Sequence, residues 1–428
     1  MRTMTAQPVS GGGEAQDGGA APLPGVSPLP EPSPLPGASP LPGTSPLPGA
    51  APLPEATPGR PRVPRHPGRP DVFTFGETMV ALRGSGPLKL GGTMRVSVAG
   101  AESNVAIGLA RLGHSVRWAG AVGEDEAGQL VLRTLRAEGV EVSGASTDQD
   151  APTGLLLFEP RLPEVTRVHY YRAGSAGSRL TADVIDRAFR AAPPRVLHLT
   201  GITPALSPTA RSAALRSLQL AREHDSLVCL DVNFRARLWT AEEASAVLRE
   251  WIPQVDVLIA SDDELPLCLP EGGGAGPAPV GGYLETSPDR ERTPDGPQSS
   301  EAPSGPADNN EPTNPPLPTI AAQAKLLLDL GVDEIVVKLG AEGATTYTHG
   351  GSLHRPAKTV RAVDAVGAGD AFVAGYLSAL LDGEEPAGCL ERAVTTGAFA
   401  VASPGDWEGA PTRAELGMLG APPGTVVR

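Results

Sequence analysis

The chain has 428 residues, including 52 glycines and 47 prolines, and a formal net charge of −14. This much glycine and proline excludes a packed core that runs through the whole chain, and the acidic charge disfavours nucleic acid as a partner. No apolar run approaches the roughly 18 residues of a membrane-spanning helix, so we also expect no membrane association.

Two segments contain much of the glycine and proline. Residues 1–70 include Ser-Pro-Leu-Pro-Gly-like hexads between Ser27 and Pro54, a composition that favours extended polyproline II. Residues 271–316 contain eight acidic residues and two arginines among Gly, Pro and Ser. We predict a disordered tail and a disordered acidic insertion. Residues 71–415 then form one large α/β domain, and residues 416–428 form a C-terminal tail.

The apolar periodicity along residues 71–415 predicts alternating strands and helices. We expect strands at 72–75, 116–121, 153–159, 166–172, 196–200, 226–232, 255–259 and 334–338, β-ribbons within 81–98 and 344–354, and helices at 101–112, 126–138, 208–223, 241–251, 320–330, 368–381 and 386–402. This order predicts a mainly parallel sheet covered on both faces, with functional groups at the carboxyl ends of its strands.

The three cysteines show no CxxC spacing, and the seven histidines show no HExxH pattern. An odd number of cysteines without a framework predicts a reducing compartment, and we expect a cytoplasmic protein. A zinc site is not indicated.

A glycine turn precedes the apolar helix expected at 368–381. Gly367, Ala368 and Gly369 can point backbone N–H groups at an anion, and the helix start adds partial positive charge. Asp370 beside such an anion would suit a base that takes the proton from an attacking hydroxyl. The alternative is a structural turn with an aspartate helix cap.

Two motifs together resemble the signatures of the PfkB, or ribokinase-like, sugar kinases: Gly-Ala-Glu-Ser-Asn at 100–104 and Asp-Ala-Val-Gly-Ala-Gly-Asp at 364–370. The resemblance extends over about 73–413, except for the insertion. It implies a three-layer αβα sandwich with a small β-ribbon lid, formed by about 81–98 and 153–171. It also implies an ATP-dependent kinase in which Asp370 is the base and the Gly367–Gly369 turn is the anion hole.

The same resemblance assigns sugar contacts to Gly100, Ala101 and Asn104. Glycine allows a hydroxyl to approach the backbone, and the asparagine amide both donates and accepts. Asn104 could instead bond its own helix start, as asparagine often does.

The segment 231–239 resembles the part of these kinases that runs between substrate and nucleotide, and Asn233 is assigned to the nucleotide side. Arg235 is the candidate for the acidic end of a substrate or the transferred phosphate, with a surface ion pair as the alternative. Ser261 stands where similar kinases have asparagine. Glu264 is the candidate for holding Mg²⁺ through water, although acids here would also cap a helix.

Further nucleotide contacts are assigned to Lys338, Gly340 and Gly343, which could equally form a plain β-turn with an exposed lysine. Asp364 is the candidate for a monovalent cation such as K⁺, as in some relatives. No GxxxxGK[ST] pattern occurs, and the glycine turn does not complete GxGxxG, so neither a P-loop nor a dinucleotide fold is indicated.

Residues 169–176 resemble a segment of 2-keto-3-deoxygluconate kinases, which assigns substrate contacts to Tyr170 and Arg172. Two arginines in the pocket would select an anionic sugar acid. Leu156 stands where some of these kinases have another tyrosine, which weakens the identification of the sugar. Fructokinase, ribokinase and 5-keto-2-deoxygluconate kinase are alternatives of the same fold. A silent scaffold or binding protein is the alternative of another class, and a homodimer through the lid is a further expectation.

Overall fold

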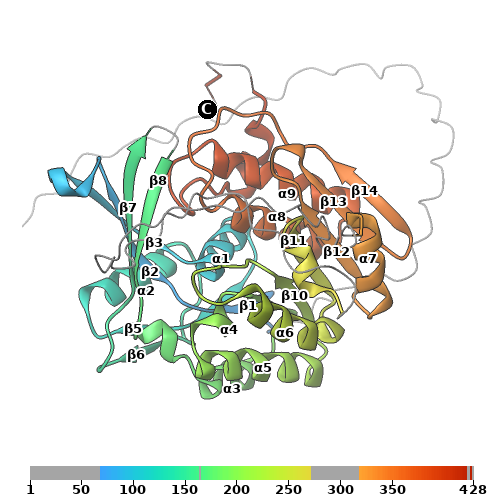
Figure 1. Ribbon diagram of the computed structural model, residues 1–428, viewed down its shortest axis with the longest axis horizontal. Helices are drawn as coiled ribbons and strands as arrows, with labels where there is room; N and C mark the ends of the chain where they lie inside the picture. Colours follow the sequence, from blue (N-terminus) through green and yellow to red (C-terminus); the bar gives the residue numbers. More distant parts are fainter. Residues whose placement is uncertain (1–67, 163–164, 271–317, 422–424, 427–428) are drawn as a thin grey trace, which may run out of the picture. The chain divides into compact units, whose positions relative to one another are not determined.

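The computed structural model describes residues 68–162, 165–270, 318–421 and 425–426, and Figure 1 shows how its elements are arranged. The predicted tail lies outside these ranges except for residues 68–70. The predicted insertion lies wholly outside them, and the predicted C-terminal tail lies partly outside. The predictions of disorder for these segments therefore stay predictions.

The main sheet has eight strands in the order β14-β13-β12-β11-β10-β9-β1-β4. The strands from β12 to β4 pair in parallel, and β13 and β14 continue the sheet antiparallel. Their bounds are β1 Val72–Phe75, β4 Val116–Ala119, β9 Val196–Thr200, β10 Leu227–Asp231, β11 Val257–Ser261, β12 Glu334–Lys338, β13 Ala344–Thr348 and β14 Gly351–Arg355. The predicted mainly parallel α/β class is confirmed.

Helices cover both faces of this sheet because alternate strand residues point to opposite sides. Leu258 of β11 belongs to one apolar core, whereas its neighbours Val257 and Ile259 belong to the other. The first core includes α3 (Ala182–Ala191), α5 (Pro208–Glu223), α6 (Ala241–Trp251) and α7 (Ile320–Asp329). The second includes α1 (Ala101–Arg111), α2 (Glu126–Ala137), α8 (Ala368–Asp382) and α9 (Pro386–Val401). Figure 1 shows α3, α5 and α6 on the side of the sheet opposite to α8 and α9.

A smaller sheet, called the lid sheet below, has the order β3-β2-β7-β8. It consists of β2 (Met79–Gly84), β3 (Met94–Ala99), β7 (Leu155–Leu162) and β8 (Val165–Tyr171), and β7 and β8 are seen at the left of Figure 1. A small apolar cluster lies on one face and includes Met79, Leu156 and Phe158. Val366, from the segment just before the glycine turn, packs against this cluster. The lid sheet therefore contacts the segment that leads into the glycine turn.

Two expectations about the elements were wrong in detail. The strand expected at 116–121 is divided at Gly120, and β5 (Ala121–Gly123) pairs with β6 (Ser146–Asp148) in a separate two-stranded sheet. A Cβ at Gly120 would lie 2.3 Å from the Trp118 ring, so the chain bends where that ring packs. Helix α3 was not expected from the sequence, yet it buries Ile185 and Phe189 fully.

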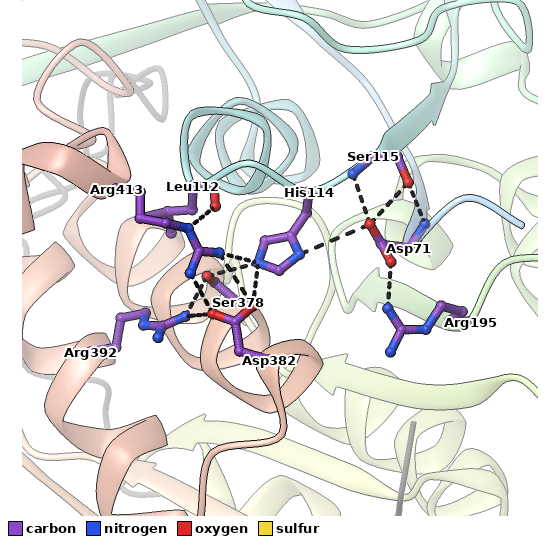
Figure 2. A network of polar contacts seen from close by, with 9 residues as sticks. All are labelled: Asp71, Leu112, His114, Ser115, Arg195, Ser378, Asp382, Arg392 and Arg413. Carbon is purple, nitrogen blue, oxygen red and sulfur yellow. Dashed lines mark hydrogen bonds and ion pairs between the residues drawn. The ribbon is translucent and has the colours of Figure 1, made fainter. Parts of the chain in front are cut away.

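A polar network lies at the amino ends of three parallel strands, because Asp71, Ser115 and Arg195 directly precede β1, β4 and β9 (Figure 2). His114 lies at its centre, and its Nε2 is 2.9 Å from Ser378 Oγ of α8. Asp382, the last residue of α8, pairs with two arginines, Arg392 and Arg413. The network therefore fixes the far end of the helix that begins at the glycine turn.

None of the helices in the described residues is long and apolar enough to span a bilayer. The three cysteines all lie within the described ranges, are buried, and form no disulfide there.

Candidate active site

The glycine turn leads directly into α8. Gly367 is the N-cap residue with φ of 74°, a left-handed conformation that glycine adopts without strain. A Cβ at this position would lie 1.7 Å from the backbone oxygen of Asp406, so a larger residue would displace the turn. Ala368 and Gly369 begin the helix, where N–H groups without intrahelical partners and the helix dipole favour an anion. The turn can therefore hold a phosphoryl group at the start of α8.

Asp370 lies in the first turn of α8 and is 8% exposed. Its Oδ2 accepts a hydrogen bond from Asn104 Nδ2 at 2.7 Å, and Asn233 Nδ2 lies 3.4 Å from its Oδ1. The Asn104 side chain thus donates to the candidate base, which lies 266 residues further along the chain, rather than to its own helix start. The side-chain oxygens of Asn104 and Asn233 are buried and have no partner within the described structure. They can therefore accept a hydrogen bond from a bound hydroxyl group.

The surroundings of Asp370 change its proton affinity. Burial raises the pKa of Asp370 to about 7, and the charge of Asp231 acts in the same direction. The hydrogen bond from Asn104 and the positive charges of Arg235 and Lys338 act against this rise. A carboxylate with a pKa near neutrality takes up a proton more readily than an ordinary aspartate and is still largely ionised above pH 7. Asp370 is therefore suited to act as a general base.

Asp231 and Lys338 form a partly buried ion pair beside Asp370. They end strands β10 and β12, and Lys338 Nζ lies 2.8 Å from Asp231 Oδ1. Burial by itself would lower the pKa of Lys338, but the carboxylates of Asp231 and Glu264 raise it above its ordinary value. A Cβ at Gly369 would lie 3.9 Å from the ammonium nitrogen. Lys338 therefore stays charged next to the anion turn.

Glu264 joins the loops that follow β10 and β11. Its carboxylate accepts hydrogen bonds from the backbone N–H of Phe234 at 2.7 Å and of Ser261 at 2.9 Å. Magnesium keeps several waters in a near-octahedral shell, so Glu264 fits as a ligand through water. Within the described ranges, no group of three His, Cys, Asp or Glu side chains could hold a metal ion directly.

The two glycines assigned to the nucleotide differ in their surroundings. Gly340 has φ of 56°, and nothing lies within 4 Å of the position of an added Cβ, so a ligand can approach it. Gly343 has φ of 105°, and a Cβ there would lie 2.0 Å from the backbone oxygen of Arg355. Glycine at 343 is therefore required by the close approach of β14, whatever else it contacts.

Two of the residues that the resemblance assigns to the sugar, Gly100 and Arg172, lie beside Glu77, which sequence analysis did not single out as a site residue. A Cβ at Gly100 would lie 2.5 Å from the Glu77 backbone oxygen, and Ala101 starts α1 directly after it. The buried Glu77 carboxylate pairs with Arg172 and accepts a hydrogen bond from Ser175. Arg172 Nε is buried and has no hydrogen-bond partner in the described structure. Glu77 therefore holds Arg172 in place, and the Nε–H of Arg172 stays available to a ligand.

Guanidinium groups gather near this donor. The ring of Tyr170 lies 5.8 Å from the guanidinium carbon of Arg172 and 5.7 Å from that of Arg237. Arg235 is exposed, donates to the backbone oxygen of Phe234 at 3.0 Å, and acts electrostatically on Asp370. Arg172 and Arg237 thus lie around the Tyr170 ring, and Arg235 adds a positive charge that acts on Asp370.

The fold and the site together are those of a kinase that acts on small molecules: a buried carboxylate with a raised pKa, a glycine turn at a helix start, and a charged lysine at the carboxyl edge of a parallel sheet. The pfkB family of carbohydrate kinases matches residues 69–273 and 310–413. The chain belongs to this family and is a carbohydrate kinase.

Relatives and solved structures agree with this assignment. The chain is 34% identical to the 2-dehydro-3-deoxygluconokinase of Bacillus subtilis, covering 81% of this chain and 94% of the relative. It is 31% identical to the 2-dehydro-3-deoxygalactonokinase of Haloferax volcanii, covering 78% of this chain and 90% of the relative. A PfkB protein from Polaromonas sp. JS666 has a TM-score of 0.63 and 32% identity, covering 81% of this chain and 99% of that one.

A ribokinase II-type protein from E. coli, solved with ATP and Mg²⁺, has a TM-score of 0.65 and 21% identity, covering 82% of this chain and 98% of that one. This level of identity is evidence for the fold alone. The predicted ribokinase-like fold is confirmed.

Proposed function

We propose that this kinase transfers the terminal phosphoryl group of ATP to a primary hydroxyl of a sugar acid, and that the acceptor is 2-keto-3-deoxygluconate (2-dehydro-3-deoxygluconate). The observation that carries the proposal is Asp370: a buried carboxylate with a raised pKa, one residue after an anion turn. A carboxylate in this position has little use except to accept a proton from a nucleophile that attacks the phosphoryl group.

The roles of the site residues follow from their contacts. Asp370 takes the proton of the acceptor hydroxyl, while Asn104 holds the carboxylate by its 2.7 Å hydrogen bond. The N–H groups of the Gly367–Gly369 turn stabilise negative charge on the phosphoryl group, and Lys338 adds a positive charge beside them. ATP with Mg²⁺ supplies the phosphoryl group when bound, with Glu264, Gly340 and Asn233 on its side of the site.

The preference for a sugar acid is supported by the arginines. Arg172 has a buried Nε–H without a partner in the described structure, and a carboxylate would satisfy it with a charge-assisted hydrogen bond. A neutral sugar would leave this donor with a weaker acceptor. The names of the Bacillus and Haloferax relatives point to substrates of the same chemical class.

Three further expectations belong to this proposal. We place the enzyme in the cytoplasm and expect it to pair through the lid sheet, where the apolar side chains of Val96, Leu162 and Tyr171 are more than half exposed. A monovalent cation at Asp364 stays a prediction from the resemblance. In the structure that carboxylate is already engaged by Arg83.

The proposal is tested by measuring ADP release with a panel of acceptors: 2-keto-3-deoxygluconate, 5-keto-2-deoxygluconate, fructose and ribose. We expect the highest kcat/KM with the first. Arg172→Ala should raise the KM for sugar acids by about 10- to 100-fold, as expected for loss of a charged hydrogen bond of about 1.5–3 kcal/mol, and should spare neutral sugars.

The matched control is Arg167→Ala, which removes an exposed arginine from the neighbouring strand β8. Equal losses of acid and neutral sugar turnover in Arg172→Ala, or a preference of the wild type for fructose, would contradict the assignment to sugar acids.

A further inference from the structure

Arg83 of the lid sheet contacts two carboxylates from distant parts of the chain. Its Nη1 lies 3.0 Å from Asp364 Oδ2, and its Nη2 lies 2.7 Å from Asp406 Oδ2. The guanidinium also stacks over the ring of Phe158, its cross-strand neighbour on β7, at 4.1 Å from the ring centre. Arg83 is therefore held by the lid sheet on one side and by two acids on the other.

Both of these acids are attached to the anion turn. Asp364 precedes Gly367 by three residues, and its Oδ1 accepts a hydrogen bond from the backbone N–H of Val366 at 3.1 Å. Asp406 contacts the turn through its backbone oxygen, which lies so close to Gly367 that no Cβ would fit. The position of Gly367 thus depends on both segments that Arg83 joins.

The site around Arg83 contains more negative than positive charge. Arg83 pairs with Asp364 and Asp406, and Glu408 adds a third carboxylate next to Asp406, whose backbone N–H donates to it at 2.9 Å. Burial raises the pKa of Asp406 to about 6, opposed by Arg83 and reinforced by the charges of Glu408 and Asp364. Without a cation between them, Asp364 and Asp406 would repel each other and move the turn. A positive charge is therefore required here, and the chain supplies its own.

We propose that Arg83 is a positioning residue for phosphoryl transfer: it is a tethered cation that holds Asp364 and Asp406 together, keeps the Gly367 turn in place, and links this turn to the lid sheet. The proposal rests on the kinase function proposed above. It replaces the monovalent cation that the resemblance places at Asp364: the wild-type enzyme needs none there, because the guanidinium already provides the charge.

The test compares Arg83→Met and Arg83→Lys with the wild-type full-length chain. The control is Arg95→Met, which removes an exposed arginine directly across from Arg83 on β3. We would measure kcat, the KM of the acceptor and Tm, each with K⁺, guanidinium ion or tetramethylammonium at constant ionic strength. The acceptor is the one that the wild type turns over fastest. If the wild type phosphorylates no sugar, the proposed function fails, independently of Arg83.

We expect wild-type kcat to change by less than about twofold between K⁺ and tetramethylammonium. In Arg83→Met, kcat should fall by about 10- to 100-fold, the effect of a misplaced reaction centre, with the acceptor KM little changed. K⁺ or guanidinium ion should restore at least about a third of the lost activity, because a free cation can enter the vacated position. The kcat of Arg83→Lys should lie between those of the wild type and Arg83→Met. The kcat of Arg95→Met should match that of the wild type.

Three results would overturn the proposal. The first is an Arg83→Met enzyme with near-native kcat in tetramethylammonium. The second is a loss of kcat that no added cation relieves, which would point to a general structural role. The third is a wild type that depends on K⁺ as strongly as the variant does. If Arg83→Met does not fold, as judged by Tm, Arg83→Gln, which also removes the charge but keeps a polar side chain, replaces it in the same measurements.

Discussion

Replacing Asp370 by asparagine separates its role in catalysis from its effect on stability. The amide oxygen of asparagine can still accept the hydrogen bond from Asn104, but its NH₂ group cannot take up a proton and would face the amide nitrogen of Asn233. We expect kcat to fall by about 10²- to 10⁴-fold, the usual contribution of a general base. The same variant should be more stable than the wild type at alkaline pH.

The size of the stability effect follows from the raised pKa. Burial moves the pKa of Asp370 from its ordinary value of 3.8 to about 7, so protonation stabilises the folded state. This stabilisation is fully present below pH 3.8 and is lost as the pH rises to 7, by at most about 4 kcal/mol at about 1.4 kcal/mol per unit. The free energy of unfolding of the Asp370→Asn variant shows no such loss as the pH rises, because its amide does not ionise. Its advantage over the wild type should therefore shrink by about 2–3 kcal/mol between pH 8 and pH 5.

Urea unfolding of both proteins at pH 8 and pH 5 measures this difference, and steady-state kinetics measures the loss of kcat. Taking the pH difference cancels the changed hydrogen bond to Asn233, which is present at both pH values. An advantage that does not change with pH would refute the raised pKa. A variant with kcat within about tenfold of the wild type would refute the role of base.

Two further predictions concern other groups that titrate or control titration. Asn104→Ala removes a hydrogen bond that favours ionised Asp370. The acidic limb of the pH profile of kcat/KM should therefore move to higher pH by about 0.5–1 unit. An acidic limb at the same pH as in the wild type would contradict this. Burial lowers the pKa of His114 below 6.5, opposed by Asp382 and Asp71, so folding stability should fall as the pH drops below 6.5. His114→Gln should reduce this fall of the free energy of unfolding in urea and leave kcat unchanged. The network lies at the amino ends of the strands and at the last residue of α8, whereas Asp370 lies in the first turn of that helix. An altered kcat would show that the network affects the site.

Much of the fold could be predicted from periodicity. The strands Val72–Phe75, Val196–Thr200 and Glu334–Lys338 and the helices Pro208–Glu223 and Ala241–Trp251 have the bounds expected from sequence. These elements have continuous apolar runs or clear helical spacing, with strong caps such as the capping box of Thr240 and Glu243. Helix α3 was missed although Val184, Ile185, Ala188 and Phe189 have helical spacing, so periodicity could have found it.

Part of the site could also be predicted from the sequence. The anion turn and Asp370 are local features: a left-handed glycine, a helix start and an acid within four residues. The contacts of Glu77, Asp231 and Arg83 are not local, since their partners lie about 100 residues or more away in sequence. No periodicity or spacing identifies such partners.

The sequence by itself therefore determined the class of this protein, because alternating apolar periodicity and two short motifs are properties of neighbouring residues. Only the tertiary structure decided how the groups act on one another. The pKa of Asp370 depends on burial, on a hydrogen bond from Asn104 and on the charges of Asp231, Arg235 and Lys338, and the Gly367 turn depends on a cation from the lid sheet. Electrostatic interactions act through space over a few ångströms, and folding alone brings these charges within that range.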